Sequence, residues 1–407
     1  MSIRNILLFA IILTLFSCKH NDYKQKILGD WKLVGMVDVE KGKPSFHSLF
    51  PGDCLRSGYT FFNNDSCDSK IGFVLPYRNK KSIFNPMTVY KLDGDSLMIY
   101  NNVDSAWNGF KIKSINGDTL LVRLPENGLH HELYYQYIKQ HYVANKAIDF
   151  DQIILTGYGT WGLNNDMSID KSGKVIYREY WPANDILRSK QRNSKLGKYL
   201  GEQDGYALYY HPQPKHFVYY TAKTSLNKFN ELLKGFQLTD FDHLKSEYRG
   251  NASDGPEVNL TFVKNGKVIK TIRADEGTGP FELIWAYMPL QYLPQKLKLD
   301  SVNSQLNPSP DARFFGFEDS HQYASIPPSM FFYLSTLLRK AKQTTIPLHK
   351  HYNVPFDESA DVAKMETDGR LYQIAWKNGG KKTYDIGFNF LTANSDVIKF
   401  ENRKEGN

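Results

Sequence analysis

Short segments of alternating apolar and polar residues, separated by turn-forming residues, run along much of the first third of the chain. The clearest lie at residues 89–100 and 111–124, where an Asp-Gly pair at 93–94 and an Asn-Gly pair at 116–117 interrupt the alternation. Both pairs suit two-residue hairpin turns, whose central residues need a positive φ. Short strands at such close spacing are typical of a barrel or a sandwich. The pattern therefore predicts an antiparallel all-β domain.

Farther along the chain, strands are mixed with helices. Residues 225–236 place Leu and Phe at helical spacing behind Ser225, a good N-cap, and residues 330–341 form a second amphipathic segment after two prolines. A tyrosine and then a hairpin follow each helix, and the hairpin turns fall at 265–266 and 368–369. This recurring order predicts a C-terminal α+β module of two related halves, with chance similarity as the alternative. The expected halves are residues 151–300 and 301–407.

The N-terminal residues follow a third pattern. Arg4 precedes an apolar run from Ile6 to Phe16, and Ser17 and Cys18 come next. A basic start, about ten apolar residues and a small residue before the cut are typical of a secretory signal. A membrane-spanning helix needs roughly twenty apolar residues, and no later run reaches that length. The pattern predicts a signal peptide over residues 1–17.

The end of this signal, Leu15-Phe16-Ser17-Cys18, resembles the lipobox of bacterial lipoproteins, although Phe16 is bulkier than the usual residue at its position. The resemblance implies that Cys18 is acylated, as with palmitate, and becomes the new N-terminus. Residues 18–24 would then tether the protein to membrane lipid. This predicts export and anchoring in the cell envelope, at the outer membrane of a Gram-negative bacterium. The alternative is an ordinary signal peptide cut elsewhere, with Cys18 incidental.

The all-β region also resembles a known family. Gly29-Asp30-Trp31, the two Gly-Asp-Ser/Thr-Leu strands and the Tyr-rich strand at 132–139 look like the lipocalin-like domains of exported bacterial lipoproteins. The resemblance implies a small up-and-down β-barrel over residues 25–140, followed by a linker at 141–150, with Trp31 packing across the closed end. Barrels of about eight strands are either filled by side chains or hold one small ligand. The aromatic residues that could line such a cavity, or form a plain core, are Trp31, Tyr59, Phe61, Tyr90, Tyr100, Trp107 and Phe110.

Two cysteines remain if Cys18 carries lipid. Export places Cys54 and Cys67 where disulfides persist, and a bridge between them would close a loop of about fourteen residues. Such a bridge is worth on the order of 3 kcal/mol in the chain-entropy model. We expect the disulfide, with two free thiols as the alternative.

Part of the C-terminal module resembles an uncharacterised domain of exported bacterial proteins. The similarity rests on residues 229–236, Tyr248 and the hairpin at 258–272. That domain normally carries a Cys-x-Gly-x-Cys-Pro segment near its start, whereas the corresponding stretch here, about 156–164, has no cysteine. The departure weakens any metal or redox role.

Composition and motifs do not indicate catalysis. The charge of +8 comes from 51 basic and 43 acidic residues without a block of like charges, so nucleic-acid binding is not expected. Neither GxSxG nor HExxH occurs. His349 and His351 could share a strand face, yet a pair of exposed histidines is the simpler interpretation. Four acidic residues near turns, Asp254, Asp275, Glu276 and Asp368, are expected to be structural because Asp often bonds its own backbone there.

We therefore expect no catalytic residue, no metal and no cofactor. The predicted function is that of a membrane-anchored envelope lipoprotein that binds a small apolar ligand, a glycan or an envelope protein. The alternative is a hydrolase of envelope or extracellular polymers that uses carboxylates of the C-terminal module. An open cleft with two facing carboxylates would favour the hydrolase.

Overall fold

The structure is a computed structural model. It describes residues 23–38, 58–70, 87–102, 105–123, 133–141, 148–158, 165–182, 215–250, 257–275, 278–302, 316–356 and 362–402. The predicted signal peptide, Cys18 and Cys54 lie outside these residues. The chain divides into two compact units, residues 1–146 with 279–295 and residues 147–278 with 296–407. Within the described residues, no helix is both long enough and apolar enough to cross a membrane.

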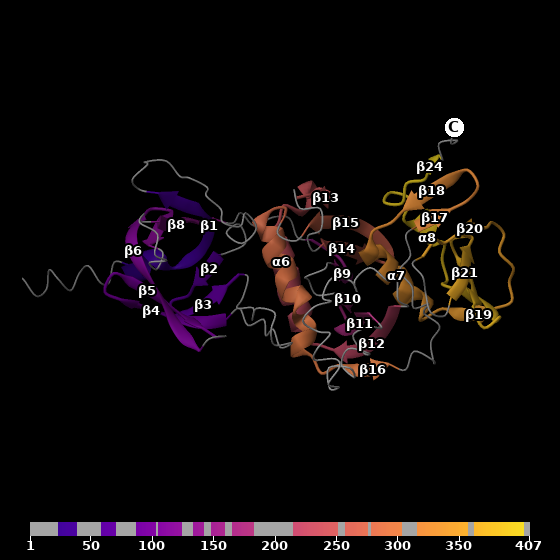
Figure 1. The fold of residues 1–407 in the computed structure, drawn as a ribbon, viewed down its shortest axis with the longest axis horizontal. Coiled ribbons are helices and arrows are strands. Elements are labelled where there is room, and N and C mark those ends of the chain that lie inside the picture. The colour runs from indigo at the N-terminus through magenta and orange to yellow at the C-terminus, as the bar shows by residue number, and fades with distance from the viewer. Residues whose placement is uncertain are drawn as a thin grey trace, which may run out of the picture. The chain divides into compact units, whose positions relative to one another are not determined.

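The first unit contains a closed eight-stranded antiparallel barrel in which each strand pairs with the next and β8 returns to β1 (Figure 1). This confirms the predicted fold class. The strands are β1 (Gly29–Asp38), β2 (Gly58–Phe61), β3 (Ser66–Ser69), β4 (Met87–Asp93), β5 (Ser96–Asn101), β6 (Ala106–Asn116), β7 (Thr119–Arg123) and β8 (Leu133–Lys139).

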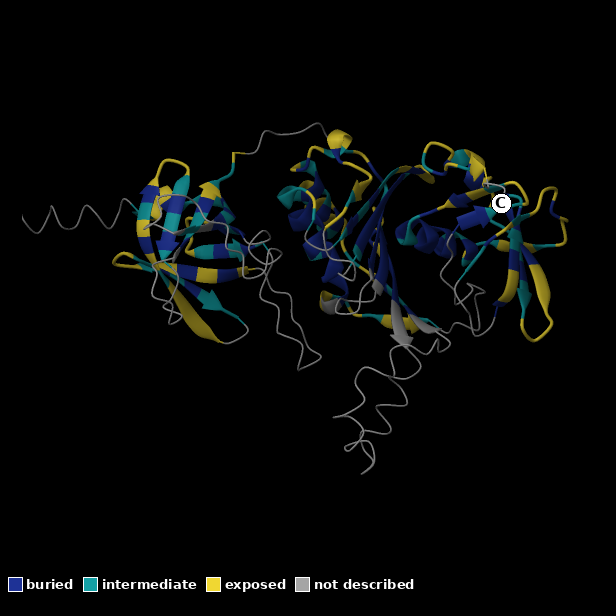
Figure 2. Ribbon diagram, turned by 45° about the horizontal axis from the view of Figure 1, so that its top comes forward, coloured by how far each residue is buried: buried dark blue, intermediate teal, exposed yellow. Residues whose placement is uncertain are grey.

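Both predicted hairpins of the barrel are present, but each turn lies one residue later than predicted. Asp93 pairs with Ser96 and Asn116 pairs with Thr119, so the two-residue turns are 94–95 and 117–118. The positive φ falls on Gly94 at 61° and Gly117 at 55°, and Asp93 and Asn116 remain in their strands. Buried and exposed positions alternate along β4, because successive side chains of a strand point to opposite faces (Figure 2). The inward positions form the barrel core.

The second unit contains two eight-stranded sheets, which we call sheet B and sheet D. Sheet B has the order β13-β15-β14-β9-β10-β11-β12-β16, and sheet D has the order β19-β23-β22-β21-β20-β17-β18-β24. The strands of sheet B are β9 (Gln152–Tyr158), β10 (Asn165–Asp170), β11 (Lys174–Pro182), β12 (Lys215–Lys223), β13 (Glu247–Tyr248), β14 (Glu257–Lys264), β15 (Lys267–Asp275) and β16 (Asp300–Val302). Those of sheet D are β17 (Gly316–Glu318), β18 (Gln322–Ser325), β19 (Lys342–Thr344), β20 (Tyr352–Asn353), β21 (Val362–Thr367), β22 (Leu371–Trp376), β23 (Lys381–Asp385) and β24 (Glu401–Asn402).

The two predicted helices are confirmed. α5 (Leu226–Gln237) begins after Ser225, whose side chain accepts a hydrogen bond from the Lys228 backbone N–H, as an N-cap does. α7 (Pro328–Leu338) begins with proline. Other helical elements of the described residues include a short helix at 23–27, α6 (Phe281–Gln291), α8 (Phe390–Ala393) and the short 3-10 helices η2 (Phe241–His243) and η3 (Leu293–Lys296).

The predicted halves share an order of elements but not a pairing scheme. In the first, the short strand β13 runs parallel to β15, the second strand of the hairpin that follows it. In the second, the short strand β20 runs antiparallel to β21, the first strand of its hairpin. The recurrence of helix, short strand and hairpin therefore does not extend to sheet topology.

Sheet B buries both of its faces, and the two faces differ in chemistry. The face toward α5 is apolar, and an aromatic cluster there joins Phe150, Phe229, Phe236 and Phe262. The other face is covered by α7, which contacts β9, β10 and β14 (Figure 1). α7 is buried on nearly all sides because its core cluster also includes residues of sheet D. Polar residues under α7 are therefore isolated from bulk water.

Candidate functional site

The interior of the barrel is the first place to look for a ligand. It leaves a cavity of about 10 Å³, which is room for roughly one water molecule. The lining residues are Tyr59, Phe61, Leu97, Ile99, Phe110, Leu120, Val122 and Tyr137. Among the described residues, side chains therefore fill the barrel, as one of the two arrangements open to a barrel of this size.

The proposed ligand-binding aromatics fall into three groups: those that line the cavity, those whose polar atoms bond to the backbone, and those on the outer face of the barrel. Tyr59, Phe61 and Phe110 line the small cavity. Trp31 is fully buried, and its Nε1–H donates to the Ile27 carbonyl oxygen at 2.5 Å, so its polar atom is already used within the fold. The Tyr90 hydroxyl donates to the Phe62 carbonyl oxygen at 3.0 Å.

Tyr100 and Trp107 lie on the outer face of the barrel. They are cross-strand partners of β5 and β6 with ring centroids 5.4 Å apart, and Trp107 is 40% exposed. The neighbouring Ile99 points inward, so strand alternation places Tyr100 outward. These two aromatics therefore do not contribute to the cavity.

The predicted disulfide is not formed in the structure. Cys67 is a free thiol on β3 that is fully buried in the barrel core, and Cys54 lies outside the described residues. Burial raises the pKa of Cys67 to about 12, and the nearby Asp68 adds to the increase. The apolar environment of Cys67 makes it a core residue, which its spacing from Cys54 could not reveal.

The α7-facing side of sheet B carries a second candidate, a row of cross-strand neighbours that we call the polar row. It consists of Arg273 of β15, Asn259 of β14, Thr156 of β9, Asp166 of β10, Arg178 of β11 and Tyr219 of β12. Registered partners in an antiparallel sheet point to the same face. All members except Arg273 are buried, with exposures of 3% or less.

An ion pair lies at the centre of the polar row. Arg178 Nε and Nη2 lie 2.6 and 2.5 Å from Asp166 Oδ2, and Arg178 Nη1 donates to the Tyr219 hydroxyl at 3.3 Å. Burial acts to lower the pKa of Arg178, but the charge of Asp166 and the contacts with Tyr219 outweigh it and raise that pKa. Arg178 is therefore charged inside the protein, which requires a partner of opposite charge.

α7 packs against the side chains of the polar row. Arg178 lies with its guanidinium carbon 4.9 Å from the Phe332 ring centroid, and Thr261 and Ser329 share a buried hydrogen bond of 2.7 Å. At the end of the helix, the Arg339 guanidinium lies 4.0 Å from the centroid of the Tyr219 ring. The polar row thus lies between a sheet and a helix.

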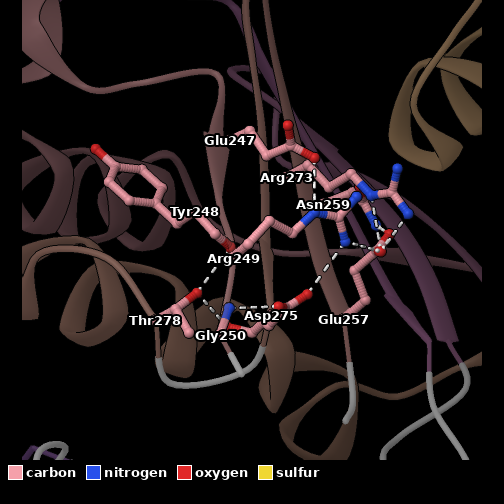
Figure 3. A network of polar contacts seen from close by, with 9 residues as sticks. All are labelled: Glu247, Tyr248, Arg249, Gly250, Glu257, Asn259, Arg273, Asp275 and Thr278. Atoms are coloured by element: carbon pink, nitrogen blue, oxygen red, sulfur yellow. Dashed lines mark hydrogen bonds and ion pairs between the residues drawn. The ribbon is translucent and has the colours of Figure 1, made fainter. Parts of the chain in front are cut away.

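The other end of the polar row reaches an exposed charged network (Figure 3). Glu257 accepts from Arg273 Nε at 2.7 Å, from Arg249 Nη1 at 3.3 Å and from Asn259 Nδ2 at 2.7 Å. Asp275 accepts from the Gly250 backbone N–H at 2.6 Å and from Arg249 Nη1 at 3.2 Å. Asn259 therefore connects the surface charges to the buried row.

Several buried atoms in and beside the polar row have no hydrogen-bond partner. They are Thr156 Oγ1, Asn259 Oδ1, Ser335 Oγ, Arg339 Nη1 and Arg339 Nη2. Buried polar groups in native proteins are nearly always hydrogen-bonded, so unpaired ones point to a functional site or to a bound molecule or water. The polar row is therefore the stronger of the two candidate sites.

Four described carboxylates have pKa values shifted by their contacts. The carboxylates Asp151, Asp319, Asp385 and Asp396 have lowered pKa values, in each case chiefly because they accept hydrogen bonds from lysine, arginine or backbone N–H groups. A general acid of glycoside hydrolysis needs a raised pKa instead. No cluster of three potential metal ligands occurs in the described part of the chain.

The other residues noted in the sequence have local roles. Asp275 belongs to the charged network, and Asp368 accepts from the backbone N–H groups of Arg370 and Leu371. His351 lies 3.8 Å from Glu366, whereas Asp254 and Glu276 lie outside the described residues. These contacts are those of turns and surface ion pairs.

The polar row itself was not predicted from the sequence. Its members come from six strands, and only the order and register of sheet B bring them together. One signal was available: Asp166 and Arg178 are charged residues in the two arms of the hairpin that turns at Ser172-Gly173. Their symmetric placement about the turn makes them cross-strand partners.

Comparison with known proteins places part of this site in a recognised family. Residues 211–294 match the model of a domain of unknown function, DUF6438, and the match runs from β12 to α6. No curated protein and no solved structure matches the chain. The chain therefore combines an N-terminal eight-stranded antiparallel barrel with a DUF6438 domain in its C-terminal part.

Proposed function

We propose that this protein is an exported lipoprotein whose acylated Cys18 anchors it at the envelope membrane, the outer membrane of a Gram-negative bacterium. The support is the basic start, short apolar run and lipobox-like Leu15-Phe16-Ser17-Cys18 segment. One acyl chain binds membranes only marginally, whereas several chains anchor a protein stably.

The C-terminal module acts as the binding module in this proposal, and the barrel acts as a spacer or a surface for an envelope partner. The observation that carries it is the contrast between the two interiors. The described barrel residues enclose about 10 Å³, whereas the polar row contains Asn259 and Thr156, which are 0% and 1% exposed and each have an oxygen without a hydrogen-bond partner. Unpaired buried oxygens favour a polar ligand over an apolar one, because leaving such groups unpaired costs about 1–3 kcal/mol each.

We favour binding over hydrolysis because of the contacts that the acidic groups make. Asp166 is the buried carboxylate of the polar row, and Arg178 neutralises it at 2.5 Å. Glu257 and Asp275 of the charged network both accept hydrogen bonds from Arg249. The oxygens of these carboxylates are therefore engaged by arginine within the fold, as in a structural ion-pair network.

The anchoring is tested by membrane fractionation of cells that produce the wild-type protein or the variant Cys18→Ser. We expect the wild type in the membrane fraction and the variant in the soluble fraction. A variant that stays in the membrane fraction would show that Cys18 is not the anchor.

The binding role is tested by native mass spectrometry of the detergent-extracted full chain. We expect a polar small molecule to co-purify with the wild type and to be lost in Asn259→Leu, which removes the amide of the polar row without changing side-chain size greatly. Tyr59→Phe, which removes a hydroxyl at the barrel cavity, is the matched control and should retain the molecule. Retention in Asn259→Leu with loss in Tyr59→Phe would assign the ligand to the barrel instead.

A further inference from the structure

Arg339 has an unusual environment at the C-terminal end of α7. Its guanidinium lies 4.0 Å from the Tyr219 ring centroid, and both terminal nitrogens are buried without a hydrogen-bond acceptor. Its place next to the last residue of the helix puts a cation where the helix dipole favours one. Neither the dipole nor the ring, however, supplies an acceptor for the two N–H-bearing nitrogens.

The charges around Tyr219 do not balance among the described residues. Arg178 and Arg339 both lie over this ring, with guanidinium carbons 5.8 and 4.0 Å from its centroid. Asp166 is the carboxylate of this cluster, and its contacts at 2.5 and 2.6 Å are made with Arg178. The described residues therefore provide no counterion for one positive charge in a buried place, where an unpaired charge is costly. A water molecule could satisfy a hydrogen bond there but not the charge.

A second unpaired donor lies on the same side of α7. Ser335 is four residues before Arg339, and side chains at i and i+4 of a helix are neighbours. Ser335 is 1% exposed, and its hydroxyl has no hydrogen-bond partner. The end of α7 therefore presents two guanidinium nitrogens and one hydroxyl that are all buried and all unpaired.

We propose that this cluster, Arg339 and Ser335 beside Tyr219, binds the carboxylate of a small organic acid. A guanidinium presents parallel N–H groups that match the two oxygens of a carboxylate, and stacking on an aromatic ring holds the guanidinium plane in place. The excess of one positive charge suits a monovalent carboxylate. Phosphate, with a charge of about −1.5 to −2 and three acceptor oxygens, would leave the cluster over-neutralised. This inference rests on the proposed binding function of the C-terminal module and names its ligand class.

The test is isothermal titration of the purified full chain with acetate, at constant ionic strength held with chloride. We expect saturable binding of one acetate per chain. Arg339→Gln should weaken it by about 10- to 100-fold, the range for loss of a hydrogen bond to a charged group. Arg339→Lys keeps the charge but not the planar fork and should also weaken binding, and Ser335→Ala should have a smaller effect. Arg370→Gln, at an exposed arginine in the turn between β21 and β22, is the matched control and should bind as the wild type does.

Unchanged acetate affinity in Arg339→Gln and Arg339→Lys, both shown to be folded by circular dichroism, would overturn the proposal. So would the absence of acetate binding to the wild type, or saturable binding of inorganic phosphate in its place. These results concern the Arg339 cluster alone, because the Asn259→Leu experiment measures binding by the module independently. Loss of the co-purifying molecule in Asn259→Leu, combined with no acetate binding, would retain the binding module and reject the carboxylate.

Discussion

Removing the buried carboxylate at position 166 should strongly destabilise the C-terminal module. Asp166 and Arg178 have side-chain exposures of 4% and 2% and a shortest N···O distance of 2.5 Å. Asp166→Asn leaves the Arg178 charge buried without a counterion, and breaking such a pair typically costs about 3–5 kcal/mol. The unpaired charge of Arg339 beside the same Tyr219 ring places the expected loss toward the upper part of that range.

The double variant Asp166→Leu/Arg178→Met distinguishes the net contribution of the ion pair from the cost of leaving one charge unpaired. Replacing both members of a buried ion pair by apolar side chains is often neutral or stabilising, so the double variant should unfold at nearly the wild-type denaturant concentration. The coupling free energy from the cycle should therefore be about 3 kcal/mol or more. Lys171→Gln, which breaks an exposed ion pair with Asp151, is the matched control and should hardly move the transition.

The assay is pulsed hydrogen exchange along a urea gradient, read by mass spectrometry of peptides. Peptides from β9–β12 report the C-terminal module, and peptides from the barrel strands serve as an internal reference that should not move. A coupling free energy below about 1 kcal/mol would refute the reasoning, because a surface pair shows that value. A double variant as unstable as Asp166→Asn would refute it as well.

Two further predictions concern local features. Gly173→Ala and Gly266→Ala both introduce a side chain at nearly the same φ, 79° and 78°, but a Cβ at Gly173 would lie 2.1 Å from the Thr224 carbonyl oxygen whereas nothing lies within 4 Å at Gly266. We expect Gly266→Ala to lower the free energy of unfolding by about 1–2 kcal/mol, from backbone strain alone. Gly173→Ala should lower it clearly more, as measured by urea unfolding. Equal losses in the two variants would show that the contact with Thr224 is easily relieved. Because burial raises the pKa of Cys67 from 9.0 to about 12, the thiol should resist iodoacetamide at pH 8 until the barrel unfolds. The folded state favours the neutral thiol, so its contribution to barrel stability should be complete below pH 9 and lost as the pH rises toward 12, and Cys67→Ala should lack this loss; rapid alkylation of the native protein would contradict the burial.

The predicted hairpins and helices illustrate what local sequence can specify. Gly94 and Gly117 mark turns because few other residues adopt the required positive φ, and that requirement depends on neighbouring residues only. The N-cap at Ser225 is equally local, since its partner is the backbone N–H three residues later. Features of this kind were predicted correctly and agree with the structure.

α6 shows where periodicity fails. Its residues Leu283 to Met288 are all buried, so the helix has no polar side to reveal a period, and Pro289 lies within it. A short apolar run cannot be assigned to helix or strand by periodicity when every side is buried. This helix was accordingly not predicted from the sequence.

The cysteines and the outer aromatics show a second kind of limit. The spacing of Cys54 and Cys67 permits a bridge, but the structure directs Cys67 into the barrel core as a free thiol. Tyr100, Trp107 and Phe110 are all aromatic residues. Phe110 lines the cavity, whereas strand alternation places Tyr100 and Trp107 on the outside of the barrel. Residue type alone does not determine which face of a sheet a side chain occupies, because that face is set by the register of the strand.

By itself, the chain sequence determined the fold class, the presence of the hairpins, the α5 cap and the division between an all-β region and an α+β region. These follow from interactions between residues a few positions apart, which a linear pattern records. Tertiary structure alone decided that the described side chains of the barrel leave little space between them, and that Arg273, Asn259, Thr156, Asp166, Arg178 and Tyr219 form one row under α7. The physical reason is that sheet order and register join residues far apart in the chain, and those pairings are set by the burial of whole elements rather than by their neighbours in sequence.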